Sequence, residues 1–329
     1  MKKIIINNKI ILPNRYILAP MAGLSDYSLR RMCYLEGVGL TYTEMVSCES
    51  VIHNSSATFF DLKTTHLEKK KNLLALQIFG GKKESILKSI PIIEKVARYD
   101  ILDFNAGCPV NKVVKQNAGS KWLTKVDELI DLMKDIVNIS SHPVSIKLRT
   151  GFNEEIDLVS LAKRLEEVGV SLIAIHGRTR KEFFFGKVNY DIIKKVKENV
   201  SIPVIANGGI SLYNASEVLS FTKADGIMIG QKALGHPEIF SNLIRLEDGK
   251  EIINLSSKEK INQLKKHLKL LFSYLDENRG VSLARGISTH YIKDFKYSAK
   301  LRSYFVRCKS KKEYFDLIKN YKNYLVETT

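Results

Sequence analysis

Short apolar runs alternate with longer amphipathic stretches from residue 16 to about residue 240. A short apolar run between turn residues is typical of a buried strand, whereas apolar positions three or four apart are typical of a helix with one buried face. The sequence predicts strands at Tyr16–Ala19, Leu40–Thr43, Leu74–Ile78, Ile101–Asn105, Val144–Lys147, Leu172–His176, Val204–Asn207 and Gly226–Ile229. It predicts helices at Ser85–Ala97, Val126–Asn138, Asp157–Val168, Asp191–Asn199 and Leu212–Phe221. Eight β/α units favour a (β/α)8 TIM barrel over a doubly wound sheet.

The pattern becomes entirely helical after about Leu243. Ser256 followed by Glu259 is a capping-box signature for a helix start. We predict helices at Lys258–Leu275, Leu283–Phe295, Ser298–Val306 and Lys311–Leu325. The sequence therefore predicts two domains, a barrel over residues 1–242 and a C-terminal all-α helical bundle over residues 243–329.

The first predicted helix of the bundle has a clear apolar face, and basic residues lie opposite it. The apolar positions are Ile261, Leu264, Leu268, Leu271, Phe272 and Leu275, and the basic ones are Lys265, Lys266 and Lys269. We expect a basic exterior carrying the aromatic residues Tyr291, Tyr297 and Tyr304.

Charge supports an anionic partner, because the formal net charge is +17. Residues 241–329 carry 19 Lys and Arg against 10 Asp and Glu, whereas the preceding 240 residues carry 33 against 25. An AT-rich genome would also produce many Lys, Ile and Asn residues, so composition alone leaves ordinary solubility open as an explanation. The concentration of charge in the tail favours nucleic acid.

Several classes of protein are disfavoured by composition. No segment approaches the roughly 18 consecutive apolar residues of a membrane helix, and the basic start lacks the apolar run of a signal peptide. The four cysteines form no Cys-x-x-Cys pair, and no His-Glu-x-x-His pattern occurs. We therefore expect a cytoplasmic protein without a membrane segment or a dedicated metal site, and we take a monomer as the default.

Polar and glycine residues gather where the predicted strands end. In a barrel these ends converge on one face, which is where barrel enzymes place their active sites. The residues are Pro20, Met21 and Ala22, then Gln77, Asn105, Cys108, Lys147, Arg149, His176 and Arg178, and finally Asn207, Gly208, Gly209, Gly230 and Gln231. This convergence indicates an enzyme.

Each of these residues also has a structural interpretation. Cys108, in a Gly-Cys-Pro turn just beyond a strand, is either a reactive thiol or a buried structural cysteine. Lys147 could end in solvent, and His176 could be a core histidine. The glycine turns after the last two strands could be simple turns, but barrels commonly build phosphate sites there, which favours a phosphate-bearing cofactor.

Taken together, the motifs resemble the tRNA-dihydrouridine synthase family, most closely its bacterial B-type branch. The motifs are Ala19–Gly23 with Asp26, Thr43–Met45, Gln77–Gly80, Asp103–Pro109, Ala118–Ser120, Lys147–Gly151, His176–Arg180, Ile202–Gly209 and Met228–Gly230. The resemblance covers residues 16 to 240 almost continuously and the helical tail more weakly.

The resemblance implies a flavin enzyme that acts on tRNA. FMN would be reduced by NADPH and would pass a hydride to C6 of a uridine, while Cys108 would protonate C5. It places FMN among Pro20, Met21, Ala22, Gln77, Lys147, His176, Asn207, Gly208, Gly209, Gly230 and Gln231. Asn105, Arg149 and Arg178 could bind the uracil edge and stabilise charge on its carbonyl.

Two departures from the family pattern stand out. Gln231 occupies the position where the family usually has an arginine that pairs with the FMN phosphate. In the tail, Arg285–His290 lacks the basic and histidine residues expected after the arginine. Two other hypotheses remain: a flavin dehydrogenase of small molecules such as dihydroorotate, and an RNA-binding protein that has lost catalysis.

Overall fold

The computed structural model describes residues 2–324, in which eight parallel strands close into a barrel. The pairing runs β4-β3-β11-β10-β9-β8-β7-β6, and β4 also pairs with β6, which closes the ring. The strands are β3 (Tyr16–Leu18), β4 (Leu40–Tyr42), β6 (Leu74–Phe79), β7 (Ile101–Ala106), β8 (Val144–Arg149), β9 (Leu172–His176), β10 (Val204–Asn207) and β11 (Gly226–Ile229). A short strand, β5 (Val46–Ser47), adds to β6. The predicted TIM barrel and its eight strands are confirmed.

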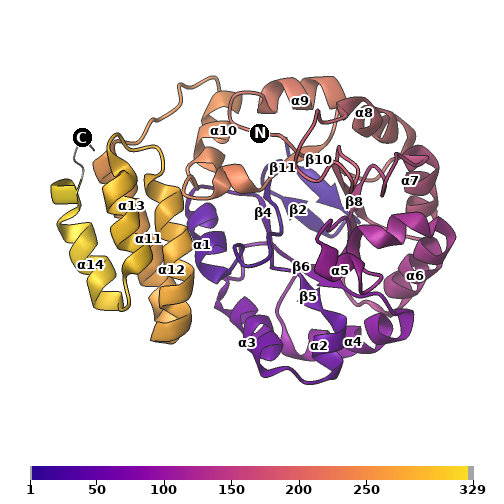
Figure 1. The fold of residues 1–329 in the computed structure, drawn as a ribbon. Helices are drawn as coiled ribbons and strands as arrows, with labels where there is room; N and C mark the ends of the chain where they lie inside the picture. The colour runs from indigo at the N-terminus through magenta and orange to yellow at the C-terminus, as the bar shows by residue number, and fades with distance from the viewer. Residues whose placement is uncertain (1, 325–329) are drawn as a thin grey trace. The chain divides into compact units, whose positions relative to one another are not determined.

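Helices alternate with these strands and enclose them, as Figure 1 shows for α4 and for α6 to α9. They are α4 (Lys83–Val96), α6 (Val126–Ile139), α7 (Leu158–Glu167), α8 (Tyr190–Asn199) and α9 (Ala215–Thr222). The sequence predicted all five, but it started α9 three residues early, because Asn214 accepts hydrogen bonds from Ser211 in a preceding turn. It did not predict the shorter helices α2 (Cys48–Ile52), α3 (Ser56–Thr64), α5 (Asn111–Val114), η1 (Thr65–Leu67) and η2 (Gly119–Thr124).

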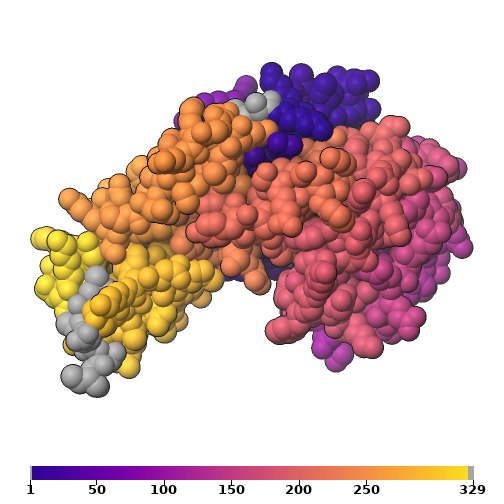
Figure 2. Space-filling view, turned by 90° about the horizontal axis from the view of Figure 1, so that it is seen from above, coloured from indigo at the N-terminus to yellow at the C-terminus, as the bar shows by residue number. Residues whose placement is uncertain are grey.

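An N-terminal hairpin that the sequence analysis missed covers the end of the barrel where the strands begin. Strands β1 (Ile4–Ile6) and β2 (Ile10–Leu12) pair antiparallel around Asn7 and Asn8, which both have positive φ, as a tight hairpin turn requires. The hairpin lies at the surface, in indigo, in Figure 2. Its buried residues join one apolar cluster with inward-facing strand residues: Ile4, Ile6, Leu12, Ile17, Leu40, Ala75, Ile101, Leu172, Ala174, Ile205 and Met228.

The barrel interior changes from apolar to polar along the strands. Side chains alternate in direction along a strand, so residues two apart share one face. Ile101 belongs to the apolar cluster, Asp103 follows two residues later, and Asn105 follows two after that. The same order runs from Ala75 to Gln77 on the neighbouring strand. The barrel is thus closed by apolar packing at one end and lined with polar groups at the other.

The chain divides into two compact units. The first comprises the chain up to Ser25 and Val38–Ile229, and contains every barrel strand. The second comprises Asp26–Gly37 and the chain from Gly230 onward, so it includes α1 (Tyr27–Leu35). Among residues 2–324, no helix is both long and apolar enough to cross a bilayer. The boundary that we predicted between a catalytic and an RNA-binding domain, at residue 242, stays a prediction about function.

The second unit is helical. Besides α1 it contains η3 (Gln231–Ala233), α10 (Ile239–Glu247), α11 (Ser257–Tyr274), α12 (Glu277–Ile292), α13 (Ser298–Arg307), α14 (Lys311–Lys319) and η4 (Tyr321–Tyr324). The capping box of Ser256 and Glu259 is confirmed, and the predicted apolar face of α11 is buried. The end of the last predicted helix, at Leu325, lies outside the described residues.

Two expectations about the second unit were wrong. Helix α12 begins six residues earlier than predicted, because Asp276 caps it by accepting from the Arg279 backbone N–H. Gly280 is tolerated inside this helix since a Cβ there would lie 2.6 Å from the Phe272 ring, so glycine permits the close packing. Tyr291 is not on the exterior but is 2% exposed, and its hydroxyl contacts the buried His267 ring.

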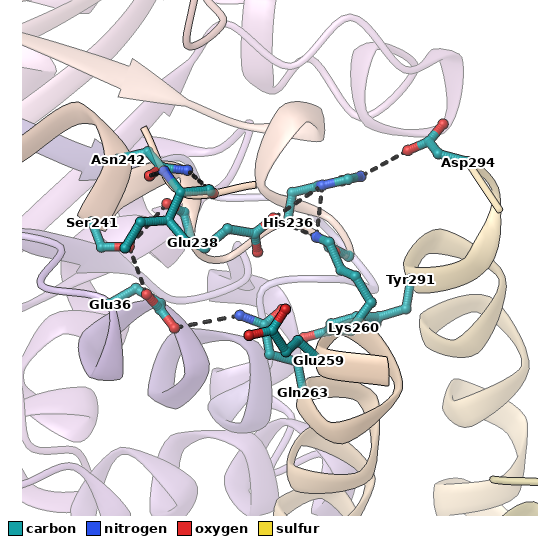
Figure 3. A network of polar contacts seen from close by, with 12 residues as sticks. Glu36, His236, Glu238, Ser241, Asn242, Glu259, Lys260, Gln263, Tyr291 and Asp294 are labelled. Carbon is teal, nitrogen blue, oxygen red and sulfur yellow. Dashed lines mark hydrogen bonds and ion pairs between the residues drawn. The ribbon is translucent and has the colours of Figure 1, made fainter. Parts of the chain in front are cut away.

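A polar network fastens the segment before α10 to α11 and to the segment that follows α12 (Figure 3). Lys260 of α11 donates to the Gly235 carbonyl at 2.9 Å, to Nδ1 of His236 at 2.8 Å and to the Glu238 carboxylate. Because an ammonium has no lone pair, Nδ1 of His236 can only accept from it, and Nε2 of His236 lies 3.0 Å from the Asp294 carboxylate. Opposite charges thus compensate one another inside this unit.

Candidate active site

Polar side chains from five neighbouring strands meet at the end of the barrel where the strands finish. The register pairs Gln77 with Asp103, Asn105 with Lys147, and His176 with both Arg149 and Asn207. The arrangement confirms that the predicted strand ends converge. Of the predicted site residues within the first unit, the structure brings together Gln77, Asn105, Cys108, Lys147, Arg149, His176, Asn207 and Gly208 through contacts described below.

Cys108 lies on a turn whose backbone is held from several sides. Its N–H donates to Oδ1 of Asn105 at 2.8 Å, and the Gly107 N–H donates to the same oxygen at 3.1 Å. The Cys108 carbonyl accepts from the backbone N–H of Ser120 at 3.0 Å and from its hydroxyl at 2.9 Å. The thiol itself is partly exposed. Burial raises its pKa, against the smaller lowering effects of a backbone hydrogen bond at Val110 and of the Lys147 and Arg149 charges. The thiol is therefore protonated at neutral pH.

Asn105 is positioned by its neighbours as much as it positions the turn. Its Nδ2 donates to Oε1 of Gln77 at 2.8 Å and approaches the sulfur of Met45 at 3.8 Å. Both amide ends are therefore engaged by the protein. Its predicted contact with a substrate stays a prediction.

Arg149 is buried beneath the same turn. Its Nε donates to the Gly107 carbonyl at 3.0 Å, and its Nη1 donates to the carbonyls of Thr179 at 2.8 Å and Phe183 at 2.7 Å. It thus ties the Cys108 turn to the loop after β9. Arg178 holds the far end of that loop by donating to the Gly186 carbonyl. Neither arrangement was foreseen, because backbone carbonyls leave no mark in a sequence.

Lys147 projects into the barrel and donates to Oδ1 of Asn207 at 3.0 Å. Burial and the charge of Arg149 lower its pKa to about 8, against the opposing influence of Asp103 and Cys108. Asn207 in turn donates from Nδ2 to the Met228 carbonyl at 2.8 Å. The alternative that Lys147 ends in solvent is wrong, since its head is held by a partner inside the barrel.

His176 is buried and uncharged. Burial and the surrounding charges of Lys147, Arg149 and Arg178 lower its pKa to about 2. Within residues 2–324, its Nδ1 is buried without a hydrogen-bond partner. A buried ring nitrogen of this kind is costly unless a bound group supplies the missing contact.

The turn after β10 presents backbone next to His176. Gly208 and Gly209 have φ of +104° and +63°, a region that favours glycine, and a Cβ on Gly208 would lie 3.1 Å from Nε2 of His176. The hydroxyl of Tyr190 donates to the Gly208 carbonyl at 2.7 Å. The turn is therefore held in place beside His176.

The remaining predicted residues lie at the ends of β3 and β11. Pro20 and Met21 are partly exposed and Ala22 is exposed, and Ser25 fixes this segment by accepting from the Met21 N–H at 3.0 Å. Gly230 and Gln231 follow β11 directly in the chain and belong to the second unit, where Gln231 is exposed.

Sequence reasoning missed Ser120, Tyr190 and Asp103. Ser120 lies in a quoted motif, but nothing local indicated that it would bind the Cys108 carbonyl. Asp103 carried a signal, because a carboxylate in the middle of an apolar strand is costly to bury without partners.

Comparisons with known proteins identify the family. A family model described as Dihydrouridine synthase (Dus) matches residues 17–327. The chain is 34% identical to tRNA-dihydrouridine synthase B of Pasteurella multocida (strain Pm70), over 97% of this chain and 98% of the relative. It is also 34% identical to tRNA-dihydrouridine synthase B of Escherichia coli (strain K12), over 94% of this chain and 96% of the relative.

Solved structures share the fold at low identity. TcOYE with pHBA matches with a TM-score of 0.58 at 12% identity, covering 78% of this chain and 95% of that one. Morphinone reductase matches with a TM-score of 0.54 at 13% identity, covering 78% of this chain and 92% of that one.

Proposed function

Because the chain belongs to the dihydrouridine synthase family, we propose that this enzyme reduces specific uridines of tRNA to 5,6-dihydrouridine with FMN and NADPH. The observation that carries the proposal is the placement of Cys108, whose thiol pKa is raised by burial, on a firmly held turn at the polar end of the barrel. Saturating the uracil C5–C6 bond requires a hydride and a proton. No side chain can supply the hydride, so a redox cofactor must.

The polar end of the barrel fits a flavin. The unpartnered Nδ1 of His176 supports a bound group with polar atoms, and the glycine turn lies beside it. The residues that would hold FMN are Pro20, Met21, Ala22, Gln77, Lys147, His176, Asn207, Gly208, Gly209, Gly230 and Gln231. When bound and reduced by NADPH, FMN supplies the hydride for C6 of the uridine.

Cys108 would deliver the proton to C5. Burial keeps the thiol protonated at neutral pH, which an acid requires. Asn105, Arg149 and Arg178 would bind the uracil edge, and the charge of Arg149 near the turn would stabilise negative charge on a uracil carbonyl. The base must leave its stack to reach this end of the barrel.

The tRNA would be bound by the basic helical segment of residues 243–329, with residues 1–242 performing the chemistry. This segment carries 19 Lys and Arg against 10 Asp and Glu over residues 241–329. Contacts with several phosphates would make affinity fall steeply between roughly 50 and 200 mM salt. A filter-binding titration across that range tests this assignment, and a flat response would contradict it.

Two measurements test the activity. The purified protein should show flavin absorbance that NADPH bleaches, and mass spectrometry should find dihydrouridine in tRNA incubated with it. Flavin reduction without a tRNA product would favour a small-molecule dehydrogenase, and the absence of flavin would favour an RNA-binding protein without catalysis. Dihydrouridine that is unchanged in tRNA from cells lacking this protein would count against the proposal.

A further inference from the structure

Asp103 begins a chain of hydrogen bonds that ends on the Cys108 turn. It lies on β7 and is completely buried. Its Oδ1 accepts from the Ser145 hydroxyl at 2.6 Å, and its Oδ2 accepts from Nε2 of Gln77 at 2.7 Å. The chain continues from Oε1 of Gln77 to Nδ2 of Asn105, and Oδ1 of Asn105 accepts the backbone N–H groups of Gly107 and Cys108.

The two ends of this chain of hydrogen bonds decide how the side-chain amides of Gln77 and Asn105 are oriented. An ionised carboxylate only accepts, so Gln77 must turn its NH2 group toward Asp103 and its oxygen toward Asn105. Asn105 must then offer its NH2 group to Gln77 and its oxygen to the turn. At the other end, backbone N–H groups only donate, so they require that same oxygen. Both ends therefore require the same orientation of the two amides, and every NH2 group or N–H group in the series faces an oxygen.

A carboxylate that only filled space would be a costly choice at this position. Both of its hydrogen-bond donors, Ser145 and Gln77, are neutral, and burying a charge without an opposite charge in contact is expensive. Consistent with that cost, burial raises the pKa of Asp103 to about 6, although the hydrogen bonds from Gln77 and Ser145 and the charge of Lys147 lower it. An apolar residue would pack there at less cost but would leave the NH2 group of Gln77 without its acceptor.

We propose that Asp103 is a positioning residue whose carboxylate, acting through Gln77 and Asn105, holds the backbone of Gly107 and Cys108 so that the thiol stays in place for proton transfer. The link to proton transfer rests on the proposed function. The positioning itself does not.

The other side of the turn sets how large the effect should be. Arg149 donates to the Gly107 carbonyl and Ser120 to the Cys108 carbonyl, so the two carbonyls stay held when Asp103 is removed. Loss of Asp103 should therefore loosen the two N–H groups without unfolding the turn. We therefore expect loss of Asp103 to lower dihydrouridine formation less than removal of the Cys108 thiol does.

The test compares three variants. Asp103→Leu replaces both acceptor oxygens by methyl groups in the same branched shape, whereas Asp103→Asn keeps an oxygen for Gln77 and should restore the chain of hydrogen bonds. Leu129→Ala, at a buried position on α6 remote in sequence from the turn, is a control for general loss of stability. Hydrogen exchange of peptides containing Gly107 and Cys108, and the rate at which iodoacetamide alkylates Cys108, report on the turn directly.

We expect Asp103→Leu to speed exchange of these two amides about tenfold or more and to change alkylation of Cys108 at least about threefold. Dihydrouridine formation should fall about tenfold, with Asp103→Asn and Leu129→Ala within about threefold of wild type in all three measurements. Equal exchange at the turn in Asp103→Leu and Leu129→Ala would overturn the proposal. If Asp103→Leu does not fold, Gln77→Met interrupts the series of hydrogen bonds at its middle residue. Protection of the Gly107 and Cys108 amides that is retained in Gln77→Met would overturn the proposal equally.

The two proposals fail in different ways. If the turn loosens in Asp103→Leu while dihydrouridine formation stays unchanged, the link between positioning by Asp103 and the reaction is overturned. Wild-type protein that forms no dihydrouridine would contradict the proposed function, whereas the exchange and alkylation results would still decide the positioning role.

Discussion

The barrel and the helical unit each bury a polar network, and the two solve the same problem differently. In the helical unit the buried cation Lys260 touches the carboxylate of Glu238, so opposite charges compensate each other. Burial acts to raise the pKa of Glu238, but its contacts with His236 and Lys260 lower it below its usual value. In the barrel the carboxylate of Asp103 has only neutral donors. Its pKa is raised instead.

This difference indicates different roles. A compensated pair holds segments together and becomes costly only when one partner is lost. An uncompensated carboxylate costs free energy in the intact protein, so its benefit must lie elsewhere, here in the direction that it imposes on a chain of amides. We expect the first network to control stability and the second to control chemistry.

The largest effect should come from the residue at the end of the barrel network. Cys108→Ala should lower dihydrouridine formation by about 10²–10⁴-fold, because general acid catalysis contributes roughly that much. Bound FMN and its reduction by NADPH should remain, and single-turnover absorbance measurements separate the two steps. Cys308→Ala, which removes a buried thiol of the helical unit, should keep turnover. Loss of flavin binding in Cys108→Ala would identify a structural cysteine.

The network of the helical unit should show its effect in stability. Lys260→Met leaves the Glu238 carboxylate buried without its partner, which should reduce the free energy of unfolding by about 3–5 kcal/mol. Urea denaturation followed by circular dichroism measures this loss. Lys258→Met removes an exposed lysine from the same helix and should change stability by less than about 0.5 kcal/mol. Similar losses in both variants would remove the contrast between the two networks.

The raised pKa of Asp103 predicts how stability depends on pH. Because the folded protein holds this proton up to about pH 6 and the unfolded chain loses it near pH 4, the group stabilises the fold most below pH 4. That contribution is lost as pH rises through about 6. The stability of Asp103→Asn relative to wild type should therefore improve by roughly 2 kcal/mol from about pH 4.5 to about pH 7.5. A difference independent of pH, as expected for Leu129→Ala, would contradict a buried carboxylate with a raised pKa.

The smallest effect should come from the exposed end of the helical network. The Asp294 side chain is 65% exposed where it accepts from His236. Solvent screens such contacts, so Asp294→Ala should cost less than about 1 kcal/mol in the same urea experiment. A loss as large as that of Lys260→Met would mean that the whole network, and not its buried pair, carries the stability.

The sequence by itself determined the barrel and the end of it at which the polar strand residues converge. Strand and helix periodicities are local, so β9, β10 and β11 could be predicted to the residue. The convergence of Gln77, Asn105, Lys147, His176 and Asn207 followed from closing eight parallel strands. The Gly-Cys-Pro turn at Cys108 was equally visible.

Only the tertiary structure decided which polar group meets which. Lys147 and Asn207 are 60 residues apart, and Gln77 and Asp103 are 26 apart, so no local pattern contains these pairs. The carbonyls bound by Arg149 and the buried position of Lys260 could not be read from side-chain chemistry either. Hydrogen bonds depend on distance and direction between groups that folding brings together, whereas periodicity needs only the order of residues along the chain.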